Sequence, residues 1–252
     1  ANRGVRIRLL LDDFASDARD HRILLSVAHP NIEMKVFNPP RRGRKHTATR
    51  KAGRLIELSQ QHRRMHNKLL LADRELVVMG GRNLGDEYFD ADTSRNFVDI
   101  DLLGIGSVAQ ELSASFEAYW RHSLAVPIEQ CLRKPGRRLG QPRQPRPMSQ
   151  EIENAWSDAP ERCAQLAAYR QAPQLGTWLD HLVWASATVL WDPPDKLATP
   201  GLPDQNHLMT RSLLPVALGV RRELTMVSAY FVPTEAGLAY FKACVARGVS
   251  VR

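Results

Sequence analysis

The 252-residue sequence contains few cysteines and no long apolar run. Its three cysteines, Cys131, Cys163 and Cys244, are too few and too widely spaced for a disulfide framework or a CxxC metal site, so we expect buried or incidental thiols. The longest apolar stretches, such as HLVWASATVLW from residue 181, are too short to span a bilayer. Any membrane contact is therefore expected to be peripheral, unless an anchor lies outside this sequence.

Acidic residues are also in deficit. Against 35 Lys and Arg there are 27 Asp and Glu, which gives a formal net charge of +8 and a pI near 9.7. A basic protein favours partners dense in negative charge, either phospholipid headgroups or nucleic acid, and charge alone does not choose between them. With 43% hydrophobic residues the chain can bury one large core or two modest ones, which excludes fibrous and disordered classes.

The order of apolar patterns predicts an α/β protein. RGVRIRLLLDD (3–13) and NIEMKVFN (31–38) predict strands, and SDARDHRILLSVA (16–28) predicts a helix between them. Two strands joined by a helix are expected to run parallel, with the helices packed outside the sheet. Residues 39–54 predict a basic, solvated loop, with contact to phosphate or headgroups as the alternative.

Further elements complete a first lobe. They are strands at HNKLLLAD (66–73), ELVVMGG (75–81) and RNFVDIDLLGIG (95–106), and a helix at SVAQELSASFEAYWRHS (107–123). The first two strands are expected to form a hairpin joined at Asp73 and Arg74. We assign residues 1–125 to most of this lobe and 126–176 to a basic Pro/Arg-rich linker and helix.

Residues 177–252 predict the start of a second lobe. Its expected elements are strands at LVWASATVLWD (182–192), ELTMVSAYFVP (223–233) and VSVR (249–252), and helices at NHLMTRSLLPVALGV (206–220) and AGLAYFKACVARG (236–248). A further helix, EIENAWSDAPERCAQLAAY (151–169), is expected within the linker region.

A short internal repeat indicates duplication. RGVSVR at 247–252 echoes RGVRIR at 3–8, an offset of 244 residues, and self-similarity of this kind predicts two related lobes. At that offset the equivalent of His66 falls near position 310, beyond Arg252. The chain is therefore expected to be a fragment of a duplicated protein, with an incomplete pseudo-twofold architecture.

The stretch MHNKLLLADRELVVMGGRN carries the chemistry. If His66 and Lys68 lie on a strand, they project to one face and present an imidazole beside an ammonium. Such a pair suits a phosphate diester, because Lys68 offsets the oxygen charge while His66 attacks phosphorus or donates a proton. Gly80 and Gly81 allow close approach of a substrate or a neighbouring backbone, and Asn83 can donate to phosphate. This arrangement requires no metal or other cofactor.

These residues resemble the H-x-K-x4-D-x6-G-G/S-x-N signature of the phospholipase D superfamily. Six residue types at fixed spacing, each at a frequency of roughly 5%, coincide by chance on the order of 10⁻⁸ per starting position. The wider sequence, including HPNIEMKVFNPP, WDPPDK and SAYFVPTEAGL, looks like the bacterial cardiolipin synthase C branch. The matching residues are His66, Lys68, Asp73, Gly80, Gly81 and Asn83.

The resemblance implies a phospholipase D-like mixed sheet flanked by helices, and a two-step transfer. Two such motifs, one in each lobe, meet to build one site; one histidine forms a phosphohistidine and the other protonates the leaving alcohol. His66 would be one of the two, Lys68 and Asn83 would bind phosphate, and Asp73 would be structural. The chain has no second H-x-K, since His181 and His207 lack the following lysine, so half the active site is expected.

The resemblance also implies residues that support the site. An acidic residue after the asparagine orients the histidine ring, and Asp99 is the candidate, with Asp101 as the alternative on the same strand face. Tyr230 and Phe231 would line a lipid-accessible wall in the second lobe, or pack in a core. Arg64 lies next to the motif and is expected to contact phosphate or solvent.

The leading hypothesis is a phosphatidyltransferase that forms cardiolipin from phosphatidylglycerol and a second phospholipid. Its partners would be these lipids, a bacterial inner membrane surface bound peripherally on either side, and a missing second motif lobe. One alternative is a phosphodiesterase or nuclease of the same superfamily, although the repeat disfavours a single-motif homodimer and nucleic acid is the less expected partner. Another is a non-catalytic lobe that binds anionic lipid or nucleic acid.

Overall fold

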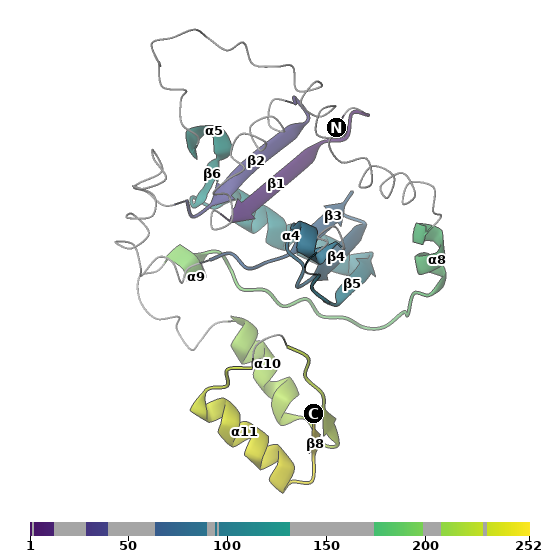
Figure 1. Ribbon diagram of the computed structural model, residues 1–252, viewed down its shortest axis with the longest axis vertical. Helices are drawn as coiled ribbons and strands as arrows, with labels where there is room; N and C mark the ends of the chain where they lie inside the picture. The colour runs from purple at the N-terminus through teal and green to yellow at the C-terminus, as the bar shows by residue number, and fades with distance from the viewer. Residues whose placement is uncertain are drawn as a thin grey trace. The chain divides into compact units, whose positions relative to one another are not determined.

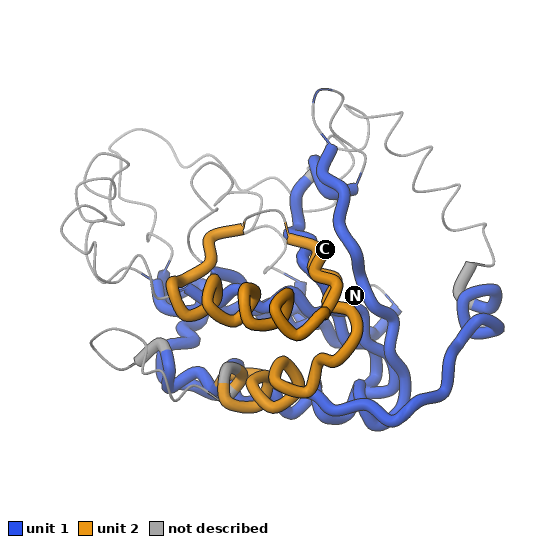
Figure 2. The backbone as a smooth tube through the Cα atoms, turned by 90° about the horizontal axis from the view of Figure 1, so that it is seen from below, with its two compact units in different colours: residues 1–189, 193–198 blue, residues 190–192, 199–252 orange. Residues whose placement is uncertain are grey.

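The computed structural model separates into two compact units (Figures 1 and 2). Unit 1 comprises residues 1–189 and 193–198, and unit 2 comprises residues 190–192 and 199–252. The helices predicted over 16–28 and 151–169, and nearly all of the loop predicted over 39–54, lie outside the described residues. The structure describes residues 1, 3–12, 29–39, 64–89, 94, 96–131, 174–198, 208–228 and 231–252.

The first sheet of unit 1 has a parallel and an antiparallel pair. Its order is β1 (Ile7–Asp12), β2 (Ile32–Phe37) and β6 (Ala125–Pro127). β1 and β2 run parallel, with Ile7 opposite Ile32, which confirms the prediction from the strand, helix, strand order. The first residues of the linker expected from residue 126 contain the end of β6 and α5 (Ile128–Cys131), and Ile128 packs with Met34 and Val36 in a buried cluster.

The second sheet of unit 1 contains the predicted hairpin. Its antiparallel order is β3 (Leu69–Ala72), β4 (Leu76–Gly80) and β5 (Asp101–Ile105). The tight turn is closed by the Glu75 N–H, which donates to the Ala72 carbonyl at 3.0 Å. Asp73 and Arg74 have φ values of 52° and 63°, the left-handed pair that matches the twist of a hairpin.

Strand β5 is shorter than predicted. The strand expected to begin at Arg95 begins at Asp101. Just before it, the Asp99 carbonyl accepts from Arg82 Nη2 at 3.0 Å, and Asp99 Oδ1 accepts from the Ile100 N–H at 2.8 Å. Side chains therefore satisfy backbone groups that would otherwise join a strand ladder.

Helix α4 (Ser107–Arg121) confirms the amphipathic helix expected over 107–123 and packs along both sheets. Near its N-terminus, Leu112 joins a buried cluster with Val77 of β4. Near its C-terminus, the Tyr119 ring lies 5.3 Å from that of Phe37 at the end of β2, and Phe37 is fully buried. One helix thus connects the cores of the two sheets within unit 1.

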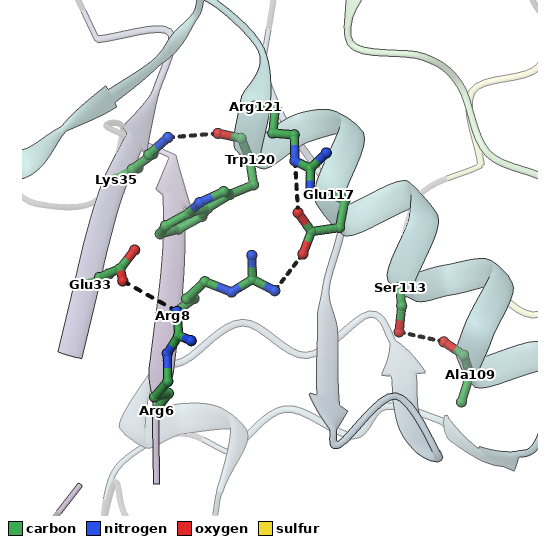
Figure 3. A network of polar contacts seen from close by, with 9 residues as sticks. All are labelled: Arg6, Arg8, Glu33, Lys35, Ala109, Ser113, Glu117, Trp120 and Arg121. Atoms are coloured by element: carbon green, nitrogen blue, oxygen red, sulfur yellow. Dashed lines mark hydrogen bonds and ion pairs between the residues drawn. The ribbon is translucent and has the colours of Figure 1, made fainter. Parts of the chain in front are cut away.

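A polar network joins the last turns of α4 to the first sheet (Figure 3). The Trp120 indole lies between two cations, with Arg8 Cζ 5.4 Å and Lys35 Nζ 4.8 Å from the ring centroid. Glu117 forms ion pairs with Arg8 and Arg121, and the hydrogen bond from Arg8 is the main cause that lowers the pKa of Glu117. These contacts hold β1 and β2 against the helix.

The described part of unit 2 contains two helices and a small parallel sheet. Thr234 caps the second helix by accepting from the Gly237 N–H at 3.2 Å. Both predicted helices and the last predicted strand are confirmed, including the helix that carries Pro215. The elements are α10 (Leu208–Leu218), β7 (Glu223–Leu224), α11 (Glu235–Ala246) and β8 (Ser250–Val251).

Two predicted strands are wrong in whole or in part. Among the described residues of 223–233, only Glu223 and Leu224 form a strand, and they pair with Ser250 and Val251 of β8. Residues 182–192 form no strand: no described segment pairs with them, and Val183 and Trp184 are 88% and 82% exposed. Apolar content alone does not make a strand without a neighbour to accept its hydrogen bonds. Short helices that were not predicted are η2 (Asp86–Tyr88), α8 (Gln174–Asp180) and α9 (Asp195–Ala198).

The repeated RGV element has the same local backbone in both copies. Gly4 and Gly248 have φ values of 82° and 79°, a conformation that favours glycine. The Gly4 N–H donates to the Ala1 carbonyl and the Gly248 N–H to the Val245 carbonyl, each at 2.9 Å. Both turns lead into a strand that pairs in parallel, so the similarity extends from sequence to backbone.

Candidate active site

The predicted catalytic pair lies in the short segment of residues 65–68, named here the His66 segment. It has no regular secondary structure and leads directly into β3, so the prediction that His66 and Lys68 lie on a strand is wrong. Side chains satisfy its backbone: Lys68 Nζ donates to the His66 carbonyl at 3.0 Å, and Asp12 Oδ2 accepts from the Met65 N–H at 3.1 Å. The His66 side chain is exposed and Lys68 is half-buried.

The ring and the ammonium of this segment are electrostatically coupled. Partial desolvation is the main cause that lowers the pKa of His66, and the Lys68 cation lowers it further while Asp12 opposes both. Desolvation also lowers the pKa of Lys68, against the opposing fields of Asp12 and Asp99. At neutral pH the site therefore holds a neutral imidazole close to a cation, the state in which a histidine nitrogen can attack phosphorus.

We expect the His66 ring to titrate below pH 6.5 in an NMR pH titration, with the signal assigned from the spectrum of His66→Ala. Because the folded state takes up this proton less readily than the unfolded chain, the contribution of His66 to stability is complete above pH 6.5. It is lost as the pH falls through the lowered pKa. In Lys68→Met the midpoint should move upward, since a neighbouring cation is gone. A wild-type midpoint at or above pH 6.5 would contradict the desolvated, cation-flanked environment of the ring.

The two adjacent glycines make room for two carboxylates. A Cβ atom added to Gly80 would overlap Asp101 Oδ1 and lie 2.8 Å from the Ile100 carbonyl oxygen. At Gly81 it would lie 2.5 Å from Asp99 Oδ2. The close approach expected at these glycines is therefore made by the first residue of β5 and the two residues before it.

Arg82 anchors the residues that come after the glycines. Its Nε donates to Asp101 Oδ2, and its guanidinium also donates to the carbonyls of Tyr88 at 2.7 Å and Asp99 at 3.0 Å. Next to it, Asn83 is exposed and its Nδ2 donates to the Tyr88 hydroxyl at 2.9 Å. Asn83 thus presents an amide at the surface, while Arg82 holds the surrounding loop.

The two candidate acids differ in their surroundings. Asp101 is paired with Arg82, and its side chain is 25% exposed. Asp99 acts on Lys68, whereas the carboxylate that acts on the His66 ring belongs to Asp12. An orienting role for Asp99 or Asp101 stays a prediction.

Of the remaining predicted residues, Asp73 lies apart from the His66 segment within unit 1. Asp73 is exposed in the hairpin turn at the far end of β3, roughly 13 Å along a four-residue strand. That position fits a structural role rather than proton transfer. Phe231 belongs to unit 2, where it is 63% exposed with its ring 5.8 Å from that of Phe241. Tyr230 lies outside the described residues.

Sequence reasoning missed Asp12. Its carboxylate accepts from Arg64 Nη1 and from the Met65 N–H, each at 3.1 Å, and its field reaches both His66 and Lys68. The available signal was the acidic pair that ends the first apolar strand. Arg64, expected to contact phosphate, pairs with Asp12 in the structure, and its contact with substrate stays a prediction. Among the residues that the structure describes, no group of three His, Cys, Asp or Glu is placed to hold a metal ion.

The family comparison agrees with the motif. The family model described as "Cardiolipin synthase, PLD-like domain" matches residues 1–120. Residues 1–120 are therefore similar to a phospholipase D-like domain. The match confirms the resemblance stated from the motif, and the residues matched to the phospholipase D-like domain contain the His66 segment, the two glycines and Asp12.

Relatives extend the similarity beyond the phospholipase D-like domain. The whole chain is 31% identical over 254 residues to cardiolipin synthase C of Escherichia coli (strain K12), of which it covers 51%. It is 31% and 32% identical to uncharacterized proteins from two strains of Helicobacter pylori and covers 48% of each. The chain thus spans about half the length of these curated relatives. No solved structure matches significantly.

Proposed function

We propose that this chain supplies one half of the active site of a phosphatidyltransferase that forms cardiolipin from phosphatidylglycerol and a second phospholipid. The observation that carries the proposal is the complete signature from His66 to Asn83, in which desolvation and the Lys68 cation lower the pKa of His66. The similarity to cardiolipin synthase C supports a phospholipid as substrate.

The proposed reaction has two displacements. One histidine nitrogen forms a bond to phosphorus while the bond from phosphorus to the departing alcohol breaks, and the other histidine gives that alcohol a proton. The second histidine then takes a proton from the incoming lipid hydroxyl, which attacks phosphorus and releases the first histidine. Lys68 and Asn83 offset charge on the phosphate oxygens in both steps. His66 can fill either histidine role.

A half-site is supported by three observations. The sequence has one H-x-K, the chain covers about half of each relative, and the RGV turn recurs with the same backbone at Gly4 and Gly248. We infer that a second motif lobe completes the site. Without that lobe, the chain has no second H-x-K histidine to protonate the leaving alcohol.

Contact with the membrane would be peripheral. Within the described part of the chain, no helix is both long and apolar enough to cross a bilayer. The net charge of +8 favours a surface rich in anionic phospholipid, which is also where the proposed substrates lie. We therefore propose the bacterial inner membrane surface as the place of action.

Product analysis tests the proposed substrate. The assay uses a longer protein that contains this chain and has the length of cardiolipin synthase C. It is incubated with vesicles of phosphatidylglycerol, alone and with phosphatidylethanolamine. In parallel it is incubated with single- and double-stranded DNA. We expect cardiolipin and the released alcohol by mass spectrometry, and intact DNA. Cleavage of DNA without any lipid product would favour the nuclease alternative. Vesicle binding that persists in His66→Ala, with no product from either substrate, would favour a non-catalytic lobe.

A further inference from the structure

Asp12 is the last residue of β1, yet it contacts a part of the chain more than fifty residues away. Oδ1 accepts from Arg64 Nη1 and Oδ2 from the Met65 N–H, both at 3.1 Å. The Asp12 and Arg64 side chains are 18% and 20% exposed, so this pair is largely shielded from water. Because each of its oxygens accepts one hydrogen bond, the carboxylate fixes the orientation of its two partners as well as their distance from it.

The bond to Met65 matters because Met65 directly precedes the candidate catalytic pair. The next residue is His66, and β3 begins three residues later at Leu69. The His66 segment therefore has two anchors, the Asp12 carboxylate at one end and the strand ladder at the other. Between them, Lys68 Nζ donates to the His66 carbonyl, a contact internal to the segment.

We propose that Asp12 is a positioning residue, whose carboxylate joins the end of β1 to the His66 segment and thereby sets where the imidazole and the Lys68 ammonium lie. Its negative charge also raises the pKa of both groups against desolvation, which places the carboxylate within electrostatic reach of each. This role differs from that of the acidic residue expected after Asn83. The activity arm of the test below rests on the proposed function, and the spectroscopic arm does not.

The test uses the full 252-residue chain and the variants Asp12→Asn, Arg64→Gln and Glu117→Gln. In Asp12→Asn, the His66 ring should titrate at a lower pH than in wild type, because a favourable negative charge is lost. The Met65 amide should also exchange with solvent at least about tenfold faster, because a hydrogen bond to a charged acceptor is removed. In Arg64→Gln, the His66 midpoint should move to higher pH, since the carboxylate loses its paired cation.

Glu117→Gln is the matched control. Like Asp12, Glu117 is a carboxylate paired with an arginine, here Arg8 of β1, but Glu117 is absent from the groups that act on His66. The His66 midpoint and Met65 exchange should be those of wild type. If Asp12→Asn does not fold, the upward shift in Arg64→Gln still tests the proposal. An unchanged midpoint in whichever of the Asp12→Asn and Arg64→Gln variants fold would overturn it.

The activity measurement uses the longer protein that contains this chain and has the length of cardiolipin synthase C. Asp12→Asn should lower kcat for phosphatidyl transfer by roughly ten- to a hundredfold with little change in KM, because misplaced reacting groups slow the chemical step more than binding. Asp12→Glu, which keeps the charge, should recover part of this loss. Loss of kcat without recovery in Asp12→Glu and without a His66 shift would contradict positioning. If wild type itself lacks transferase activity, the proposed function fails while the NMR measurements still decide the role of Asp12.

Discussion

Replacing His66 with alanine is expected to reduce phosphatidyl transfer by at least about a thousandfold, measured as cardiolipin formed by the protein continued to the length of its relative. Either histidine role in the proposed reaction leads to this result, because the first displacement needs both a nucleophile and an acid for the leaving alcohol. The fold should be unaffected, since the His66 side chain is exposed and the hydrogen bond from Lys68 is made to the His66 backbone carbonyl, which alanine keeps.

The control for this substitution is His181→Ala. His181 is also exposed and lies in unit 1, in the turn after α8, but it is not followed by the lysine of the motif. Its activity should equal that of wild type. Equal activity in His66→Ala and His181→Ala would remove His66 from the reaction. A fall in both variants with a lowered unfolding midpoint would point to lost structure instead.

Gly80→Ala is expected to lower the free energy of unfolding by about 2 kcal/mol, measured by urea denaturation. Its added methyl group would meet Asp101, which pairs with Arg82, and the backbone carbonyl of Ile100. A backbone oxygen cannot move without shifting β5 against β4. The same shift should reduce activity, because it would displace Asp99, which lies just before β5, and Asn83, which lies just after the two glycines.

A helical glycine supplies the control for Gly80→Ala. Gly176 lies within α8, and an added Cβ atom there meets nothing within 4 Å. Gly176→Ala should leave stability unchanged or raise it by about 0.5–1 kcal/mol, because alanine is the better helix former. Equal free energies of unfolding for Gly80→Ala and wild type would contradict this, because they would show that the residues before β5 can shift at little cost in stability.

The hairpin and α4 were predictable because their signals are local. Two apolar runs joined by Asp73 and Arg74 specify a tight turn, and both residues adopt the left-handed conformation that such a turn requires. In α4 the apolar residues recur at helical spacing, so the buried face can be read from the sequence without knowing what covers it. The motif residues were identified by their resemblance to the phospholipase D signature, and their roles in the reaction stay predictions.

Features that depend on distant partners were not predictable. The strand expected from His66 begins at Leu69, because the preceding backbone bonds to Asp12 and Lys68 rather than to a neighbouring strand. The contact between Asp12 and Met65 joins residues 53 positions apart, and no periodicity signals it. Residues 182–192 have strand-like composition, but among the described residues no partner strand accompanies them.

The central claim is that this chain carries half of a two-histidine site for phosphodiester transfer. The most direct measurement compares turnover of phosphatidylglycerol, per mole of His66, by the 252-residue chain and by the protein continued to the length of cardiolipin synthase C. We expect cardiolipin from the longer protein, and a rate at least about a thousandfold lower from the chain alone, because the proposed reaction needs two motif histidines and this chain has one H-x-K. Comparable rates from both proteins, each abolished by His66→Ala, would contradict the claim and show that this chain completes a site without a second lobe.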